Sequence, residues 1–392
     1  LPFSALGDRI GHRRLYQWGQ IVFTVATLLC FFARSLPFLL FIRAVQALGA
    51  AAALSVSSAI VRSIYPSGQL GRGLGVNSVV VSSAAALAPA VGGMVLAIAP
   101  WPWIFASAVP FAALSLLLGR WLPDPVPREE PYDVLGAVLC AATFGLIISG
   151  LESGVHGNSP VVSAAIVAAG VAIAIVFVRR ELTEAPPIMP VDLLGQPVFA
   201  LSTIGALTAF TASMTLIVSL PFRLEHSFGL LPSQVGAIIA PWPLTIMVVA
   251  PLAGALSDRF PAWLLGGIGM AVSAAALVLL AYLPAHPAYW DFAWRMSLCG
   301  AGFGMFLSPN ARLIIGSAPR ARAAAVGGLI STTRMLGQTL GATLVATLLA
   351  FGFGGGHAPA LIAAALAAIA GICSVARITP ASRDHAQAPI EV

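Results

Sequence analysis

Long apolar blocks run through this chain, separated by short segments that carry proline, glycine and arginine. One block, AAIVAAGVAIAIVFV at residues 164–178, is apolar on every face that a helix could present. Crossing the ~30 Å hydrocarbon core of a membrane takes about 20 apolar residues in a helix, whereas the strands of a membrane barrel alternate apolar with polar residues. The pattern therefore predicts membrane-spanning helices rather than a barrel.

The apolar blocks predict twelve spans. They lie at residues 16–33, 37–61, 74–98, 101–121, 134–151, 160–178, 198–221, 233–256, 262–283, 289–311, 325–350 and 358–376. Leu1 falls inside what resembles the end of an earlier helix, so we interpret the chain as a fragment that lacks its N-terminal spans.

Composition supports an all-α polytopic membrane protein, because 59% of the 392 residues are hydrophobic and only 9% are charged. The four cysteines fall in predicted spans without a paired spacing, which favours apolar packing over disulfides or a metal site. They are Cys30, Cys140, Cys299 and Cys373.

All twenty basic residues are arginine, and their distribution predicts the orientation of the chain. If the segment 8–14 is cytoplasmic, fifteen arginines fall on that side, and only Arg34 and Arg223 fall on the other. Cytoplasmic loops of membrane proteins carry an excess of Lys and Arg. The split therefore predicts an inner-membrane protein with a cytoplasmic C-terminus, and it explains the net charge of +6 without a nucleic-acid partner.

The absence of lysine excludes several enzyme classes. A P-loop needs a lysine on the nucleotide phosphates, and a pyridoxal-phosphate enzyme needs one for its Schiff base. The chain also has no Gly-x-Ser-x-Gly elbow and no His-Glu-x-x-His motif. We therefore predict no enzymatic activity, no cofactor and no metal, and we expect the six histidines to lie solvated in loops or in the tail.

Three pairs of similar segments suggest a duplicated half. Residues 255–259 (ALSDR) echo 5–9 (ALGDR) at an offset of 250, Arg295 follows Arg43 at 252, and residues 337–341 follow 88–92 at 249. Six spans over that offset would need about 42 residues each, whereas eight need about 31, close to one helix with a short loop. Two extra spans are therefore expected between the halves.

This organisation predicts four regions. They are the remainder of an N-terminal helix bundle at 1–121, an inserted helix pair with linkers at 122–197, a C-terminal bundle at 198–378 and a cytoplasmic tail at 379–392. Repeated six-helix halves, with the substrate handled between them, are a recurrent plan of transporters.

Five motifs resemble those of the major facilitator superfamily, and more narrowly its fourteen-span drug:proton antiporter branch. In chain order they are SALGDRIGHR (4–13), RAVQALGAA (43–51), AAALAPAVGG (84–93), GAGFGMFLSPN (300–310) and RMLGQTLG (334–341). The first is similar to the loop between helices two and three of that superfamily, the second to its helix-four signature, and the third to the antiporter motif of helix five. The resemblance implies two six-helix bundles with two inserted helices. Compared with that fourteen-span pattern, this chain is expected to lack span one and most of span two.

The resemblance also implies a function, which is proton-coupled export of hydrophobic small molecules or drugs by alternating access. Protons and the lipid bilayer are then partners, and a periplasmic adaptor protein is a further one. The resemblance assigns Arg43 to proton coupling and a seal against proton leak to Pro89, Gly92 and Gly93. For these last three residues, ordinary packing of a kinked helix is the alternative.

The opening loop suggests how two helices could be locked together. Asp8 can accept hydrogen bonds from a neighbouring helix and pair with Arg9 or Arg13, and Gly11 permits a tight turn. The echo at residues 255–259 adds Asp258 and Arg259 to this gating loop. The resemblance implies that the loop stabilises the outward-facing conformer. A solvated orientation signal would explain the arginines equally well, but not Asp8 together with Gly11.

Arg43 is the strongest candidate inside a span, because a guanidinium there costs ~2.5–3.5 kcal/mol on insertion scales. Gln46 lies three positions on, on the same helical face, and can share a polar cavity with it. Arg334, with Gln338 at i+4, is expected to line the C-terminal half. The alternative for Arg43 is a side chain that reaches the outer interface.

The sequence leaves the substrate open. None of the fourteen acidic residues lies near the midpoint of a predicted span, which favours neutral or anionic hydrophobic substrates over lipophilic cations. A secondary transporter for one metabolite, such as an antibiotic, a siderophore or an amino acid, is an alternative. A non-transporting membrane sensor would not need polar residues inside its spans, and a subunit driven by a separate ATPase is disfavoured by the repeat.

Overall fold

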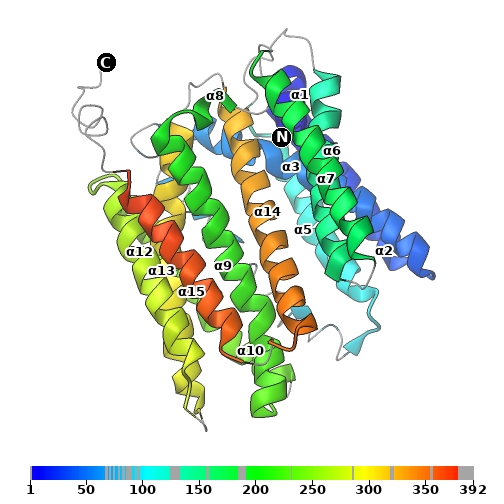
Figure 1. Ribbon diagram of the computed structural model, residues 1–392. Helices are drawn as coiled ribbons and strands as arrows, with labels where there is room; N and C mark the ends of the chain where they lie inside the picture. The colour runs from blue at the N-terminus through cyan, green and yellow to red at the C-terminus, as the bar shows by residue number, and fades with distance from the viewer. Residues whose placement is uncertain are drawn as a thin grey trace.

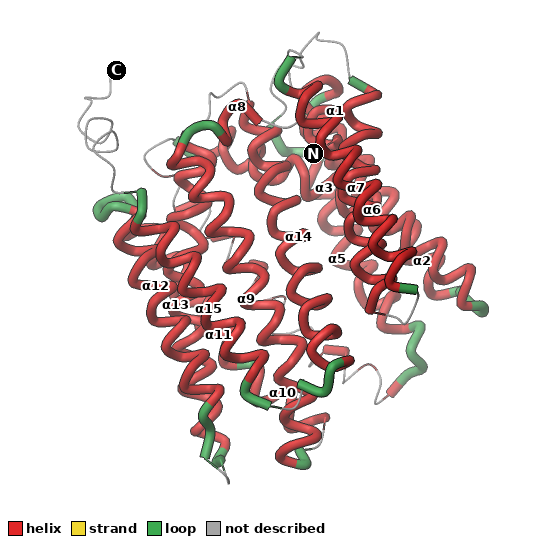
Figure 2. The backbone as a smooth tube through the Cα atoms, viewed as in Figure 1, coloured by secondary structure: helices red, strands yellow, loops and turns green. Residues whose placement is uncertain are grey.

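The structure is a computed structural model. It describes residues 2–66, 98–123, 133–155, 159–183, 191–230, 232–284, 287–317, 322–353 and 356–377, together with isolated positions between 69 and 95. Helices account for all of the regular secondary structure in this described part (Figures 1 and 2).

The helices fall into three groups along the chain. The first group is α1 (Pro2–Ile10), α2 (His12–Phe31), α3 (Leu36–Ile64) and α5 (Trp103–Gly119). The second is α6 (Val134–Val155), α7 (Pro160–Glu181) and α8 (Val191–Leu194). The third is α9 (Pro197–Phe228), α10 (Pro232–Ile239), α11 (Pro241–Leu256), α12 (Ala262–Ala281), α13 (Tyr289–Gly316), α14 (Ala323–Ala350) and α15 (Ala358–Val375).

Eleven of the twelve predicted spans coincide with described helices, and the span at 74–98 lies mostly outside the described residues. Eight candidate spans, counted over the described part, are long and apolar enough to cross a membrane. The helices α2, α5 and α14 lie at predicted positions but are shorter or less apolar than these eight. The predicted span 233–256 is divided into α10 and α11 at Ala240, where Pro241 has no backbone N–H to continue the helical hydrogen bonds.

The helices run roughly parallel and pack within their groups (Figure 1). In the first group, α2 packs against α3 and α5. In the third, α9 packs against α14 and α15, and α13 packs against α11 and α12. The helices α6 and α7 form a hairpin in which Arg180 pairs with Asp133, and the main contacts between the first and third groups are those of α14 with α1 and α3. The predicted region boundaries remain predictions.

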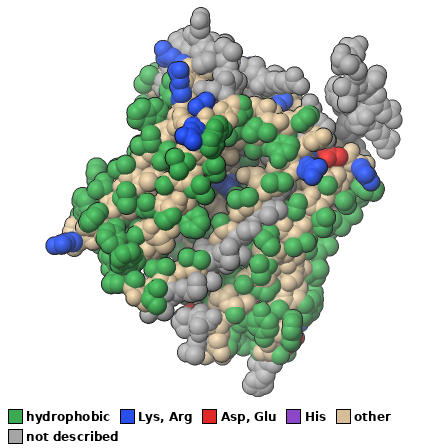
Figure 3. Space-filling model, turned by 180° about the vertical axis from the view of Figure 1, so that it is seen from behind, with side chains coloured by type: hydrophobic (Ala, Val, Ile, Leu, Met, Phe, Trp, Pro, Cys, Tyr) green, Lys and Arg blue, Asp and Glu red, His purple; other side chains and the backbone are tan. Residues whose placement is uncertain are grey.

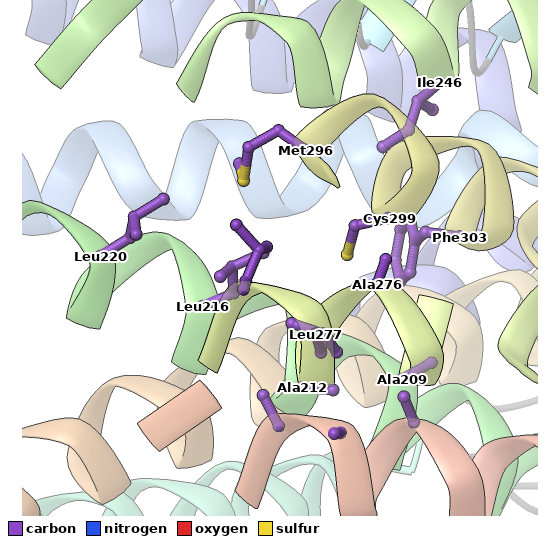
Figure 4. Close-up of a cluster of buried hydrophobic side chains, with 14 of the residues drawn as sticks. Ala209, Ala212, Leu216, Leu220, Ile246, Ala276, Leu277, Met296, Cys299 and Phe303 are labelled. Carbon is purple, nitrogen blue, oxygen red and sulfur yellow. The ribbon is translucent and has the colours of Figure 1, made fainter. Parts of the chain in front are cut away.

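Glycines allow the helices of the third group to approach closely. A Cβ atom on Gly337 would lie 2.8 Å from the Leu207 carbonyl oxygen, and one on Gly341 would lie 2.6 Å from the Thr211 carbonyl oxygen. The interface between α14 and α9 is therefore built on a small-xxx-small spacing. Apolar side chains of α9, α11, α12 and α13, among them Leu216 and Met296, fill the core of this group (Figure 4).

The surface suits a hydrocarbon environment. Large apolar side chains face outward from many helices, for example Phe111 and Val161, which are 74% and 76% exposed. We call the end that carries α8, α1 and the end of α15 the α8 end, and the end that carries α10 the α10 end (Figure 1). On the face seen from behind, most of the arginines gather toward the α8 end (Figure 3).

Candidate functional site

A chain of polar side chains links α2 to α3 inside the apolar helices. Gln46 Nε2 donates to Thr27 Oγ1 at 2.7 Å, and Arg43 Nη1 donates to Gln46 Oε1. Thr27 and Gln46 are buried, at 0% and 5% exposure. Because an unpaired buried polar group is costly, this chain holds the Arg43 side chain in one direction.

Close packing of α2 on α3 brings this polar chain together. A Cβ atom on Gly49 would lie 2.7 Å from the Gly19 carbonyl oxygen and 2.6 Å from the Phe23 backbone nitrogen, so the two backbones touch about one turn from Gln46 and from Thr27. Glycine at both positions thus fixes the spacing at which the Gln46 amide reaches Thr27. The expected pairing of Arg43 with Gln46 is confirmed, and the role of the pair in proton coupling stays a prediction.

The charge of Arg43 has no carboxylate partner in the part of the chain that the structure describes. Its guanidinium lies 5.7 Å from the centre of the Phe105 ring on α5, an attractive cation–π geometry. Arg43 is exposed, whereas Gln46 is buried. The arginine is therefore the accessible end of the polar chain, and Thr27 is its buried end.

Arg334 and Gln338 lie one turn apart on α14, and neither is fully exposed. Arg334 Nε is buried, and no described residue accepts a hydrogen bond from it. Gly337, which lies between them, packs on α9 against Leu207 and Phe210. The structure thus places the second predicted arginine on a helix that contacts α3, the helix of Arg43. It brings the two helices together but shows no bond between the two arginines.

The opening loop makes the expected tight turn. Gly11 has a φ of +100°, which a side chain would disfavour, and it separates α1 from α2. The described partner of Asp8 is His12, whose Nε2 lies 3.0 Å from Asp8 Oδ1, and not Arg9 or Arg13. His12 begins α2, four positions after Asp8, so the shorter ring reaches the carboxylate where Arg9 points to solvent.

The repeated loop makes a different contact. Asp258 pairs with Arg312 of α13 at 2.8 Å, and Arg312 also donates to the Ser257 carbonyl oxygen. Arg259, the neighbour predicted to act with Asp258, is exposed. The lock at this corner therefore uses an arginine from a helix 54 positions away in the sequence.

Arg62 connects two helix groups at the α8 end. Its Nη1 donates at 2.6 Å to the carbonyl oxygen of Ile315, in the last turn of α13. The last carbonyls of a helix lack partners within it and carry partial negative charge, so a cation is favoured there. Sequence analysis placed Arg62 only among the orienting arginines, because spacing cannot reveal a partner 253 positions away.

A set of buried apolar side chains, the α8-end cluster, surrounds this contact. Its members come from α6, α7, α8, α9, α13 and α14, and they pack on Ala5 of α1 and Val61 of α3. The members are Ala137, Cys140, Phe177, Leu193, Phe199, Ile314, Ile315, Val326 and Leu329. All three helix groups are thus sealed together at the α8 end.

Arg377 forms a second network that the sequence did not reveal. Sequence analysis counted it only among the arginines on the cytoplasmic side, yet it is only 3% exposed after the end of α15. Its Nη2 donates to Asn310 Oδ1 at 2.7 Å, and Asn310 Nδ2 donates to the Ser202 carbonyl oxygen at 3.1 Å. Burial lowers the pKa of Arg377 to about 10, so it remains charged at neutral pH. An asparagine after Pro309 inside a predicted span was the available signal.

The α10 end of the third group is capped by Arg223. It donates at 2.8 Å to the carbonyl oxygens of Leu280 and Ala281, which end α12. His357 is exposed in the loop before α15, as expected of the histidines, and it also contacts the Ala281 carbonyl oxygen. His12 departs from that expectation, because its side chain is only 11% exposed beside Asp8. Both rings satisfy groups at helix ends. Arg295, the third arginine inside a predicted span, pairs with Asp291 near the same end.

The helix-five motif lies largely outside the described residues, including Pro89 and Gly93. Gly92 is described and helical, and a Cβ atom placed on it would meet no described atom within 4 Å. The described residues therefore show no close helix packing at Gly92. The proton seal stays a prediction.

Comparison with known proteins places these features in a family. The model of the Major Facilitator Superfamily matches residues 1–342 and 202–391. "Uncharacterized transporter YebQ" of Escherichia coli K12 is 44% identical over 388 residues, covering 98% of this chain and 85% of that protein.

More distant relatives carry names that state a substrate or a resistance. "Riboflavin transporter RibZ" of Clostridioides difficile is 28% identical, with 87% of this chain and 74% of that protein covered. "Methyl viologen resistance protein SmvA" of Salmonella typhimurium LT2 is 27% identical, with 90% and 72% covered.

A solved structure has the same fold. The human organic anion transporter MFSD10 superposes with a TM-score of 0.70 at 15% identity, covering 95% of this chain and 79% of that one. The family match spans essentially the whole chain, and the all-helical architecture agrees with it. The chain is therefore a membrane transporter that belongs to the Major Facilitator Superfamily.

Proposed function

We propose that this chain is a proton-coupled exporter of hydrophobic small molecules that works by alternating access. The polar chain from Thr27 through Gln46 to Arg43 carries the proposal. A guanidinium in a span costs ~2.5–3.5 kcal/mol on insertion scales, and here the buried Gln46 amide orients it by accepting its hydrogen bond. The Arg43 side chain is therefore oriented to interact with a group whose charge changes during transport. Binding and release of a proton would change the charge of such a group.

The α8-end cluster supports the alternating-access part of the proposal. Alternating access requires that one end of the transporter be sealed while the other admits substrate. Buried apolar residues and the contact between Arg62 and Ile315 seal the α8 end. With the predicted orientation, this end faces the cytoplasm, and a seal there is what an outward-facing conformer requires.

Relatives support drug export, and one of them supports a second candidate function. SmvA is named for resistance to methyl viologen, and "Multidrug resistance protein Stp" of Mycobacterium tuberculosis H37Rv is 27% identical, with this chain covering 64% of it. RibZ is named for the transport of a single metabolite. A transporter dedicated to one metabolite is therefore the alternative. Inhibition of dye transport by many chemically unrelated compounds would contradict that alternative.

The test is dye efflux with inside-out vesicles that contain the chain. An imposed pH gradient should drive dye accumulation, and Arg43→Ala should lower the rate at least ~tenfold, because a charged hydrogen bond is worth ~1.5–3 kcal/mol. Arg34→Ala is the matched control, since Arg34 is exposed in the turn before α3. An equal rate in Arg43→Ala would remove Arg43 from the mechanism. Transport that survives an uncoupler but stops without ATP would overturn proton coupling.

A further inference from the structure

The helices α3 and α14 carry arginine but neither Asp nor Glu. Two long stretches of the sequence, residues 9–123 and 292–383, contain no Asp or Glu. They hold α3 with Arg43 and α14 with Arg334. Arg295, the other arginine in a predicted span, is neutralised by Asp291. Of the three arginines in predicted spans, Arg43 and Arg334 are therefore the two without a carboxylate partner among the described residues.

Arg334 lies deep in its helix. It is the twelfth residue of α14, which places it about 17 Å from the α8 end of that helix at 1.5 Å per residue. Its Nε is buried without an acceptor, and no ion pair of Arg334 occurs among the described residues. Donors oriented in a fork but left unpaired match the geometry of a carboxylate or sulfonate.

Arg43 lies nearer the other end. It is the eighth residue of α3, about 10 Å from the α10 end of that helix. Gln46 satisfies part of its guanidinium without neutralising the charge, because an amide oxygen carries no net charge. Since α3 contacts α14, the two arginines lie on adjoining helices at different depths, where each could bind an anion in turn.

These charges discriminate between substrates by sign. A cation held 8 Å from one guanidinium at an effective dielectric of 20 would bind about 30-fold more weakly than a neutral molecule, and an anion would gain by the same factor. An anion also offsets the desolvation of the arginine. The apolar helices around the arginines suit the rest of an amphipathic molecule.

We propose that the substrate is an amphipathic organic anion whose carboxylate or sulfonate group binds Arg334, with Arg43 as a second cationic station toward the α10 end. This inference rests on the exporter function proposed above and names its substrate class. An anion leaving the cell also moves down the membrane potential, which at 100 mV favours its exit about fiftyfold. Export of the anion is therefore driven by voltage as well as by the pH gradient.

Two xanthene dyes of opposite charge test this inference. Inside-out vesicles containing the chain are given fluorescein as the anion or rhodamine 6G as the cation, and the trapped dye is measured after lysis at fixed pH. Fluorescein should accumulate at least ~tenfold above protein-free vesicles, and a potassium–valinomycin potential should raise its uptake further. Rhodamine 6G should stay at the protein-free level.

Three variants locate the site. Arg334→Gln should lower fluorescein uptake at least tenfold, Arg334→Lys should retain an intermediate uptake because it keeps the charge but not the fork, and Arg34→Gln should match the unmodified chain. If Arg334→Gln is lost from the membrane, Gln338→Cys gives a second reading. Fluorescein should then slow maleimide labelling of that cysteine, and rhodamine 6G should not.

Each contrary result has a distinct meaning. Gradient-driven uptake of rhodamine 6G without uptake of fluorescein would overturn the anion inference and leave the exporter proposal standing. Equal fluorescein uptake in Arg334→Gln, or unprotected labelling of Gln338→Cys, would remove Arg334 as the binding residue. Uptake of neither dye would overturn the exporter proposal and this inference with it.

Discussion

The corner formed by α1, α2 and α3 and the corner formed by α11 and α13 hold the same residue types 250 positions apart, but they connect them differently. In the second corner, Arg312 pairs with Asp258 and donates to the Ser257 carbonyl oxygen. In the first, Arg62 stands where Arg312 does, yet it donates to Ile315 of α13, and Asp8 pairs with His12. One corner closes on itself, and the other reaches into the neighbouring helix group.

This difference separates a scaffold contact from a switch contact. A bond within one helix group survives a movement of that group as a body, whereas a bond between groups must break when they separate. In an alternating-access cycle, the contact between Arg62 and Ile315 must therefore be lost each time the α8 end opens, and the pair of Arg312 and Asp258 can persist. The same ancestral pattern would then serve two purposes.

The largest expected effect comes from Arg62→Ala. Loss of a charged hydrogen bond, worth ~1.5–3 kcal/mol, should shift the chain toward opening of the α8 end by about 10- to 100-fold. Cys140, which is 1% exposed in the α8-end cluster, is a native reporter of that opening. In a background that lacks the other three cysteines, a membrane-permeant maleimide should label Cys140 at least ~tenfold faster.

Two controls accompany this measurement. Arg14→Ala removes an exposed arginine at the same end and should leave the labelling of Cys140 unchanged. When Cys299 is the single cysteine, its labelling in Arg62→Ala should be as slow as in the parent, since Cys299 is buried in the core of the third group. Unchanged labelling of Cys140 in Arg62→Ala would erase the distinction between the two corners.

A smaller effect is expected from Arg312→Ala. The pair with Asp258 is about one quarter exposed on each side, at 26% and 27%, so it is worth ~0.2–1 kcal/mol, with the carbonyl contact adding about 1 kcal/mol. The thermal unfolding temperature in detergent should fall by about 2–6 °C, while the rate of Cys140 labelling stays within about twofold of that of the parent. An opening as large as that of Arg62→Ala would make this corner a switch as well.

The smallest effect is expected from Asp8→Asn. His12 would lose a charged partner four positions away on adjoining helices, which is worth ~0.5 kcal/mol. The unfolding temperature should fall by less than about 2 °C, with Cys140 labelled at the parental rate. If Asp8→Asn instead opens the α8 end as Arg62→Ala does, the opening loop rather than Arg62 is the lock.

Local pattern predicted local features well. Apolar length placed eleven spans where described helices lie, the position of Gly11 predicted the turn between α1 and α2, and spacing of three predicted that Arg43 and Gln46 meet. Each of these depends on residues within one or two helical turns. Partners of Asp8 and Asp258 were predicted among their immediate neighbours, and both partners proved to be other residues.

The sequence by itself determined that this protein is a bundle of apolar helices with its acidic residues at their ends and a few arginines within, because hydrophobicity and helical period are properties of consecutive residues. Only the tertiary structure decided which carbonyl oxygen accepts from Arg62, that Arg377 is buried against Asn310, and that Arg334 has no partner among the described residues. Those outcomes depend on where helices 67 or 253 positions apart in the sequence come to lie, and a guanidinium binds whichever acceptor that packing brings within 3 Å.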